Sequence, residues 1–172
     1  MTPQHIFLVG PMGAGKSTIG KHLADLLDLP FVDVDTEIES RAGADIQWIF
    51  DMEGEQGFRD RECKVLLDLA DNRELKVIAT GGGIVLRDEN RAVLQRSGTV
   101  IYLSATAEQL FERTRRDKSR PLLQVEDRRA VIAELVEIRD PLYNQVSDLV
   151  FPSGSMQPNK LAKKLAEAVS VL

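Results

Sequence analysis

Residues 10 to 17 read Gly-Pro-Met-Gly-Ala-Gly-Lys-Ser and match the pattern G-x-x-x-x-G-K-[S/T] at every position. A chain of 172 residues would show this pattern by accident less than about one time in a hundred. In such a segment, glycines let backbone N–H groups point into one concavity around phosphates, and the following helix N-terminus adds partial positive charge. Lys16 would reach the β and γ oxygens, and the Ser17 hydroxyl would be a magnesium ligand. We therefore expect a triphosphate site formed by Gly13, Ala14, Gly15, Lys16, Ser17 and Thr18.

Short apolar runs alternate with longer amphipathic stretches along the chain, as in βα units that build a parallel sheet. The expected strands are 6–9, 31–34, 77–80, 100–103 and 149–151. They lack polar alternation, which is typical of strands buried on both faces. A helix is expected over 16–27, and Thr106 followed by Gln109 indicates a capping box before another. The predicted fold class is α/β: a P-loop NTPase three-layer sandwich with a five-stranded parallel sheet flanked by helices.

Two stretches interrupt this alternation within what we expect to be a single domain over 1–172. Residues 36–69 are too many for one crossover helix and predict a helical insertion. Residues from about 113 to 126 are polar and basic, although the whole chain is acidic, and predict a mobile loop flanked by helices.

Charge and composition exclude several classes of protein. A net charge of −5 argues against a general nucleic-acid binder, because phosphate contacts need a basic face. No apolar run approaches the roughly 18 residues of a membrane span, and the N-terminus lacks the features of a secretory signal. The single cysteine, Cys63, has no partner for an internal disulfide and no neighbours that complete a metal site. We expect a cytoplasmic monomer with small-molecule partners, no nucleic acid and no membrane.

Two large classes of nucleotide-binding protein do not fit the sequence. A GTPase needs an Asn-Lys-x-Asp element, but the only Asn-Lys, Asn159-Lys160, is followed by Leu161 and Ala162. A dinucleotide-binding turn of the type G-x-G-x-x-G lacks the lysine present here. A small ATP-dependent kinase remains.

Two acids and a run of glycines follow the expected second and third strands. Asp33 and Asp35, one residue apart, would project from the same side of an extended segment toward the nucleotide. One could organise magnesium through water and the other accept a proton from the acceptor hydroxyl, although either acid could instead cap the helix that starts near Thr36. The glycines of Thr80-Gly81-Gly82-Gly83 suggest that a backbone or a ligand approaches closely, although a plain tight turn is the alternative.

Six segments stand in the order seen in shikimate kinase, and this resemblance covers essentially the whole chain. They are 10–17, Asp33-x-Asp35, Gly57-Phe58-Arg59, Thr80 to Gly83, Arg120-Pro121-Leu122-Leu123 and Arg139-Asp140-Pro141-Leu142-Tyr143. The resemblance implies ATP-dependent phosphorylation of the 3-hydroxyl of shikimate, in chorismate and aromatic amino-acid synthesis. ATP would be the co-substrate and Mg²⁺ the cofactor.

The resemblance also implies roles for individual residues. Asp35 would contact the ring hydroxyls as candidate base, and Asp33 would organise magnesium through water. Gly81 and Gly82 would contact shikimate through backbone, and Arg59 and Arg139 would bind its carboxylate, since guanidinium pairs bidentately with carboxylate. Taken alone, each arginine would more often be a surface residue. In the basic stretch, Arg120 would reach the transferring phosphoryl group when the lid closes, and Arg113 would lie against the adenine.

Two other functions remain open at this stage. One is a different small-molecule kinase on the same fold, such as a gluconate or nucleotide kinase. An acceptor without a carboxylate would make the pair Arg59 and Arg139 unnecessary. The other is a non-catalytic ATP-binding regulator, which would need neither the acceptor base Asp35 nor the lid arginine Arg120.

Overall fold

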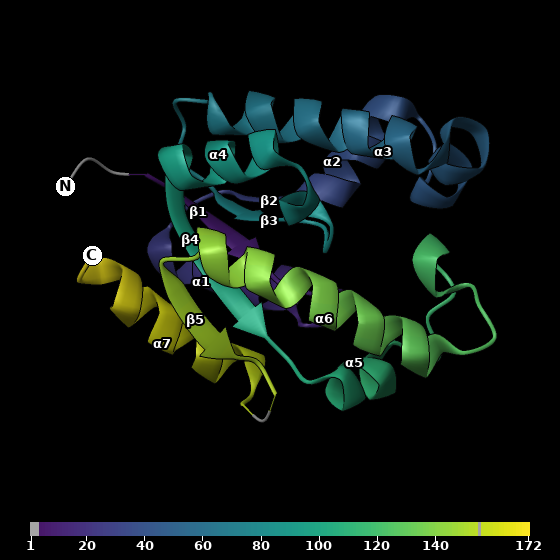
Figure 1. Ribbon diagram of the computed structural model, residues 1–172. Helices are drawn as coiled ribbons and strands as arrows, with labels where there is room; N and C mark the ends of the chain where they lie inside the picture. The colour runs from purple at the N-terminus through teal and green to yellow at the C-terminus, as the bar shows by residue number, and fades with distance from the viewer. Residues whose placement is uncertain (1–3, 155) are drawn as a thin grey trace.

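A five-stranded parallel sheet forms the centre of the molecule (Figure 1). This computed structural model describes residues 4–154 and 156–172. The strand order is β2-β3-β1-β4-β5, so the strand that leads into the phosphate-binding segment lies in the middle. The strands are β1 (His5–Val9), β2 (Phe31–Asp33), β3 (Val77–Ala79), β4 (Gly98–Ser104) and β5 (Leu149–Pro152). The predicted fold class is confirmed, and the strand bounds differ from the expected ones by at most two residues.

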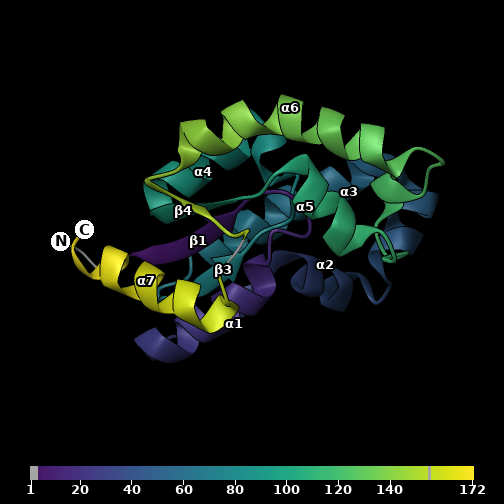
Figure 2. The ribbon, with the colours of Figure 1, turned by 90° about the horizontal axis from the view of Figure 1, so that it is seen from below.

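Helices cover both faces of this sheet, as Figures 1 and 2 show from two directions. They are α1 (Lys16–Leu27), α2 (Val34–Ala42), α3 (Ile46–Ala70), α4 (Asp88–Ser97), α5 (Ala107–Thr114), α6 (Arg128–Val146) and α7 (Pro158–Ser170), with short 3₁₀ turns η1 (Ile84–Leu86) and η2 (Pro121–Leu123). One apolar core joins the sheet to α1 and α7, and another joins it to α2, α3, α4 and α6. No helix in the part of the chain that the structure describes is both long and apolar enough to cross a bilayer.

Strand β1 shows why the apolar runs carry no polar alternation. Phe7 and Val9 are buried in the core on the α3 side, whereas Ile6 and Leu8 are buried in the core on the α1 side. Because both faces of the strand are covered by helices, every one of these positions must be apolar.

Strand β2 ends earlier than expected, and this corrects the predicted geometry of the two acids. The Asp33 carboxylate accepts a hydrogen bond from the backbone N–H of Thr36 at 3.2 Å and so caps α2. The chain is therefore helical from Val34, and Asp35 lies in the first turn of α2. The prediction that Asp33 and Asp35 project from one extended segment is wrong, because the capping acid turns the chain into a helix between them.

The two interruptions of the βα pattern lie at the same end of the molecule (Figure 1). Helices α2 and α3 fill the expected insertion, and α3 is kinked at Gly54, whose φ of 72° lies in the left-handed region. The basic stretch, which we call the lid (residues 113–126), consists of the end of α5, the turn η2 and the connecting residues before α6. Turn η2 contacts α3. The insertion and the lid therefore face each other beside the carboxyl ends of the strands.

Candidate active site

The phosphate-binding segment joins β1 to α1. Gly13 and Gly15 have φ values of 82° and 92°, which side-chain-bearing residues rarely adopt. Gly15 is the N-cap of α1, and no side chain caps the first turn or places an acid there. The first N–H groups of a helix have no partner within the helix. Here no side chain takes them, so the start of α1 is suited to an anion, and phosphate binding there stays a prediction.

Lys16 lies over this segment and is only 8% exposed. Its Nζ donates to the carbonyls of Gly10 at 2.7 Å and Pro11 at 2.8 Å. Burial, with the positive charge of Arg120 second, lowers the pKa of Lys16 from 10.5 to about 7. Among the described residues the Lys16 ammonium has no carboxylate at hydrogen-bond distance, and two neutral carbonyls hold it. Phosphate oxygens would replace these carbonyls, because they are stronger acceptors.

Asp33 does two things at once, although its capping and metal roles looked like alternatives in the sequence. One carboxylate oxygen, Oδ1, caps α2, while Oδ2 accepts a hydrogen bond from the Ser17 hydroxyl. Two oxygen ligands of the kind magnesium prefers are therefore in contact beside the phosphate site. The capped N–H is that of Thr36, near which the helix was expected to start.

Two cavities meet beside these residues. The first, of about 440 Å³, is lined by the phosphate segment together with Asp33 and Arg113. The second, of about 480 Å³, is lined by α2, α3, the lid and α6, including Arg59 and Arg139. Asp35 and Arg120 line both. The arrangement has room for a nucleotide and a small acceptor with their reacting groups on either side of Asp35.

The Asp35 carboxylate stands at this boundary with an unused acceptor. Its Oδ1 is buried and has no hydrogen-bond partner among the described residues. Burial, reinforced by the negative charge of Asp33, raises the pKa of Asp35, while Lys16 and Arg120 act in the opposite direction. A buried carboxylate oxygen without a donor is a suitable acceptor for a substrate hydroxyl.

Arg59 from α3 and Arg139 from α6 come together in the second cavity. Their exposed fractions are 6% and 4%, so neither is the surface residue that an isolated arginine usually is. Arg59 donates through Nη1 to Glu62 at 2.9 Å and through Nη2 to Glu55 at 3.4 Å. Among the described residues no ion pair engages Arg139, and a buried cation without such a partner favours an anionic ligand, because an uncompensated buried charge is costly.

The three glycines after β3 make room for these side chains. A Cβ on Gly81 would come within 2.9 Å of Asp35 Oδ1, and one on Gly82 within 3.3 Å of Arg139 Nη1. A Cβ on Gly83 would overlap the guanidinium of Arg59. A tight turn is present, since the Ile84 N–H donates to the Gly81 carbonyl at 3.2 Å, but none of the three glycines has a positive φ, so the turn alone does not require glycine. The expectation of a close approach is met by side chains of the protein itself, and backbone contact of Gly81 and Gly82 with a substrate stays a prediction.

Glu62 is a site residue that the sequence analysis missed. It is fully buried, its Oε1 accepts from Arg59, and its Oε2 has no partner among the described residues. A Cβ on Gly81 would lie 3.1 Å from this second oxygen, so Glu62 and Asp35 face the same point. The spacing Arg59-x-x-Glu62 on a helix was the available signal, since residues three apart are neighbours.

Burial raises the pKa of Glu62 even though Arg59 is beside it. A carboxyl with a raised pKa in the folded state stabilises the fold at low pH, and this contribution is lost as the pH rises through that pKa. The stability of the unchanged protein relative to Glu62→Gln should therefore fall as the pH rises from the ordinary glutamate pKa, about 4.3, toward neutral. Urea unfolding of both proteins across this range measures it. A relative stability that rises with pH would show that the ion pair with Arg59 outweighs burial.

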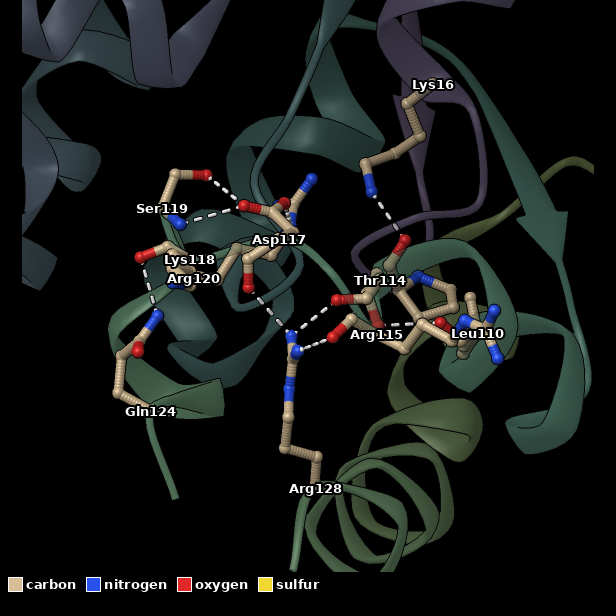
Figure 3. Close-up of polar contacts among 11 residues, drawn as sticks. Lys16, Leu110, Thr114, Arg115, Asp117, Lys118, Ser119, Arg120, Gln124 and Arg128 are labelled. Carbon is tan, nitrogen blue, oxygen red and sulfur yellow. Dashed lines mark hydrogen bonds and ion pairs between the residues drawn. The ribbon is translucent and has the colours of Figure 1, made fainter. Parts of the chain in front are cut away.

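The lid arginines occupy different places. Arg113 donates to the carbonyls of Gly13 at 3.1 Å, Ser153 at 2.9 Å and Gly154 at 3.2 Å, and so joins the phosphate segment to the β5–α7 loop. This places it on the wall of the nucleotide cavity, and its contact with adenine stays a prediction. Arg120 lies at the cavity boundary, paired through Nε with Asp117 at 2.9 Å (Figure 3).

Comparison with known proteins agrees with this geometry. A family model described as Shikimate kinase matches residues 12–170. Shikimate kinase of Histophilus somni (strain 2336) is 50% identical over 170 residues, covering 98% of this chain and 97% of that protein. The solved structure of shikimate kinase from Acinetobacter baumannii in complex with shikimate has a TM-score of 0.96 and 46% identity, covering 99% of this chain and 94% of that one.

A gluconokinase from Sinorhizobium meliloti has the same fold, with a TM-score of 0.57 and 17% identity over 98% of this chain and 97% of that one. This similarity concerns the fold alone.

Proposed function

The chain belongs to the shikimate kinase family, and on that premise we propose that it transfers the γ-phosphoryl group of ATP to the 3-hydroxyl of shikimate. The products are shikimate 3-phosphate and ADP, in chorismate and aromatic amino-acid synthesis. The observation that carries the proposal is the meeting of the two cavities at Asp35 and Arg120. One cavity has the phosphate segment and the other has two buried arginines, so donor and acceptor would be adjacent.

The nucleotide side is assigned to the phosphate segment and the lid. Backbone N–H groups of residues 13–18 surround the phosphates, and Lys16 neutralises charge on the β and γ oxygens. The buried position of Lys16 strengthens this contact, because water does not screen it. Arg113 closes the cavity at the β5–α7 loop.

Magnesium is proposed to bind at Ser17 directly and at Asp33 through water. Among residues 4–154 and 156–172, no three His, Cys, Asp or Glu side chains gather into a metal site. The residues fit magnesium nonetheless, because this ion is commonly held by one or two protein oxygens together with phosphate oxygens and water. When bound, it would neutralise charge on the β and γ phosphates.

The acceptor side is assigned to Asp35, Arg59, Arg139 and the backbone of Gly81 and Gly82. The two guanidinium groups bind the shikimate carboxylate, and the cavity is deep enough to remove both from water. Asp35 accepts the proton of the 3-hydroxyl as the oxygen of that hydroxyl forms its bond to the γ-phosphorus. The bond from the γ-phosphorus to the bridging oxygen breaks, and its electrons leave on ADP.

Arg120→Ala should lower kcat by at least about tenfold, the low end of what charge stabilisation in the transition state supplies. Arg120 lines both cavities, so it lies where charge develops during transfer. Steady-state kinetics with shikimate and Mg-ATP measure the effect. Arg116→Ala, which removes an exposed lid arginine that lines neither cavity, is the matched control. An unchanged kcat for Arg120→Ala would remove this residue from the mechanism.

One assay tests the proposed function against its alternatives. Purified protein, Mg-ATP and shikimate are mixed, and shikimate 3-phosphate and ADP are quantified together. Both products in equal amounts support the proposal. ADP release only with another sugar acid or a nucleotide would favour a different small-molecule kinase, and no ADP release above background would favour a non-catalytic binder.

The assembly and the compartment of the protein are also proposals. Residues of one chain line both cavities, which supports an active form without a second copy. We propose that a monomer is the active form. A free cysteine, Cys63, suits the reducing cytoplasm, where we expect the protein to act.

A further inference from the structure

Arg128, near the start of α6, binds the backbone of the lid (Figure 3). Its guanidinium donates to the carbonyl oxygens of Thr114 and Arg115 at 2.5 Å and of Asp117 at 2.9 Å. Thr114 is the last residue of α5, and the final carbonyls of a helix have no partner within the helix. The guanidinium of Arg128 thus binds three backbone carbonyls, one at the last residue of α5 and two just after it.

The same stretch is attached on its other side to the nucleotide site. Thr114 is buried, and its methyl group is so close to Gly13 that a Cβ there would lie 2.7 Å from it. Arg113 is bonded to the carbonyl of Gly13. The end of α5 is therefore held against the phosphate segment, and Arg128 extends this fixed region as far as Asp117.

Asp117 connects this fixed region to the lid arginine. Its carboxylate accepts from the Ser119 backbone at 2.8 Å, from the Ser119 hydroxyl at 2.5 Å and from Arg120 Nε at 2.9 Å. Its carbonyl is one of the three that Arg128 binds. One residue thus links the two arginines, with Arg128 on the helix side and Arg120 on the cavity side.

We propose that Arg128 and Asp117 are positioning residues for phosphoryl transfer, which hold the lid so that Arg120 stands at the boundary of the two cavities. This rests on the proposed function of the site. Neither residue needs to touch a substrate. Their effect is to order Arg120 before the reaction, which lowers the cost of placing its charge at the transferring group. A lysine cannot replace Arg128, because a point charge lacks the planar fork that reaches several carbonyls.

A double-mutant cycle tests the proposal. Arg128→Lys, Arg128→Ala and Asp117→Asn are made alone and in the Arg120→Ala background. Each single variant should lower kcat at least about fivefold, with the KM for shikimate within about twofold of the unchanged protein. In the Arg120→Ala background the same changes should alter kcat less than about twofold, because residues that act through one another are not additive.

Arg129→Ala is the matched control on the same helix. Arg129 pairs with Glu108 and lies 4.0 Å from the ring centroid of Phe111, so it also joins α6 to α5. It makes no contact with the lid carbonyls among the described hydrogen bonds. Its kcat should stay within about twofold of the unchanged protein. An equal loss of kcat with and without Arg120, or no loss in the Arg128 variants, would overturn the proposal.

A second measurement needs no turnover of shikimate. Trypsin can cleave the lid at exposed basic residues such as Arg116 and Lys118. In the presence of a non-hydrolysable Mg-ATP analogue, the lid of Arg128→Lys should be cut at least about fivefold faster than that of the unchanged protein, with Arg129→Ala unaffected. If the unchanged protein phosphorylated no shikimate, the proposed function would be wrong. The rate of trypsin cleavage would still show whether Arg128 holds the lid in place. Equal cleavage rates would overturn it.

Discussion

Replacing Asp35 with asparagine is expected to lower kcat by at least about a hundredfold while Mg-ATP still binds. Asparagine keeps the shape of the side chain and removes only its charge and its ability to accept the proton. Asp35 Oδ1 is buried at the cavity boundary without a partner among the described residues, so it is free to accept the proton, and asparagine removes this capacity. The phosphate segment and Lys16 are unchanged, and nucleotide affinity should change little.

The measurement combines initial rates of shikimate 3-phosphate formation with calorimetric titration of Mg-ATP. Glu37→Gln is a suitable control, since Glu37 lies in the first turn of the same helix but pairs with Arg41 at the surface. The control should keep normal rates. Transfer by Asp35→Asn at the normal rate would show that Asp35 is not the base.

Arg139→Met is expected to raise the KM for shikimate at least about 25-fold, because the loss of one side of a buried charged contact costs at least about 2 kcal/mol. Arg139 is the better of the two arginines for this test. Arg59 has Glu62 and Glu55 as partners, so its removal would leave a buried carboxylate unpaired and would also destabilise the fold. Among the described residues no ion pair engages Arg139, and methionine fills a similar volume.

Kinetics with shikimate varied at saturating Mg-ATP measure this effect, and the KM for ATP should stay within about twofold. Thermal unfolding of the same variant shows whether the fold is intact. Arg91→Met is a control of the same type, on α4, where the arginine is bonded to the carbonyls of Val85 and Leu86 and lines neither cavity. An unchanged KM for shikimate in Arg139→Met would remove this arginine from the carboxylate site.

The elements of the fold were largely predictable because each signal lies within a few residues. The helix over Lys16–Leu27 has the predicted bounds, and Thr106 with Gln109 forms the predicted capping box. The segment around Asp33 was mispredicted because the same acid that ends a strand also caps the next helix. Whether Asp33 or Thr36 caps the helix depends on the groups that each side chain meets in the folded chain, and the sequence alone does not show these groups.

The sequence predicted the residues of the candidate site that belong to ligand-binding motifs. It did not predict the residues that act by contacting other side chains or backbone groups of the protein. Lys16, Asp35 and Arg120 all line the expected cavities. Glu62 and Arg128 on helices and Asp117 in the lid were missed, because acids and arginines usually face solvent. Their roles depend on partners that lie elsewhere in the chain, for example the carbonyls 11 to 14 residues before Arg128.

By itself, the sequence determined that this chain holds a triphosphate between a strand and a helix, since positive φ at Gly13 and Gly15 and a lysine in the first turn are local requirements. Only the tertiary structure decided that the two arginines named from the resemblance are buried side by side in one cavity. Arg59 from α3 and Arg139 from α6 are brought together over Gly82 and Gly83, which have no side chains to exclude them. Both guanidinium groups are buried there, and among the described residues no ion pair engages Arg139, which favours an anionic ligand because charges removed from water need a partner.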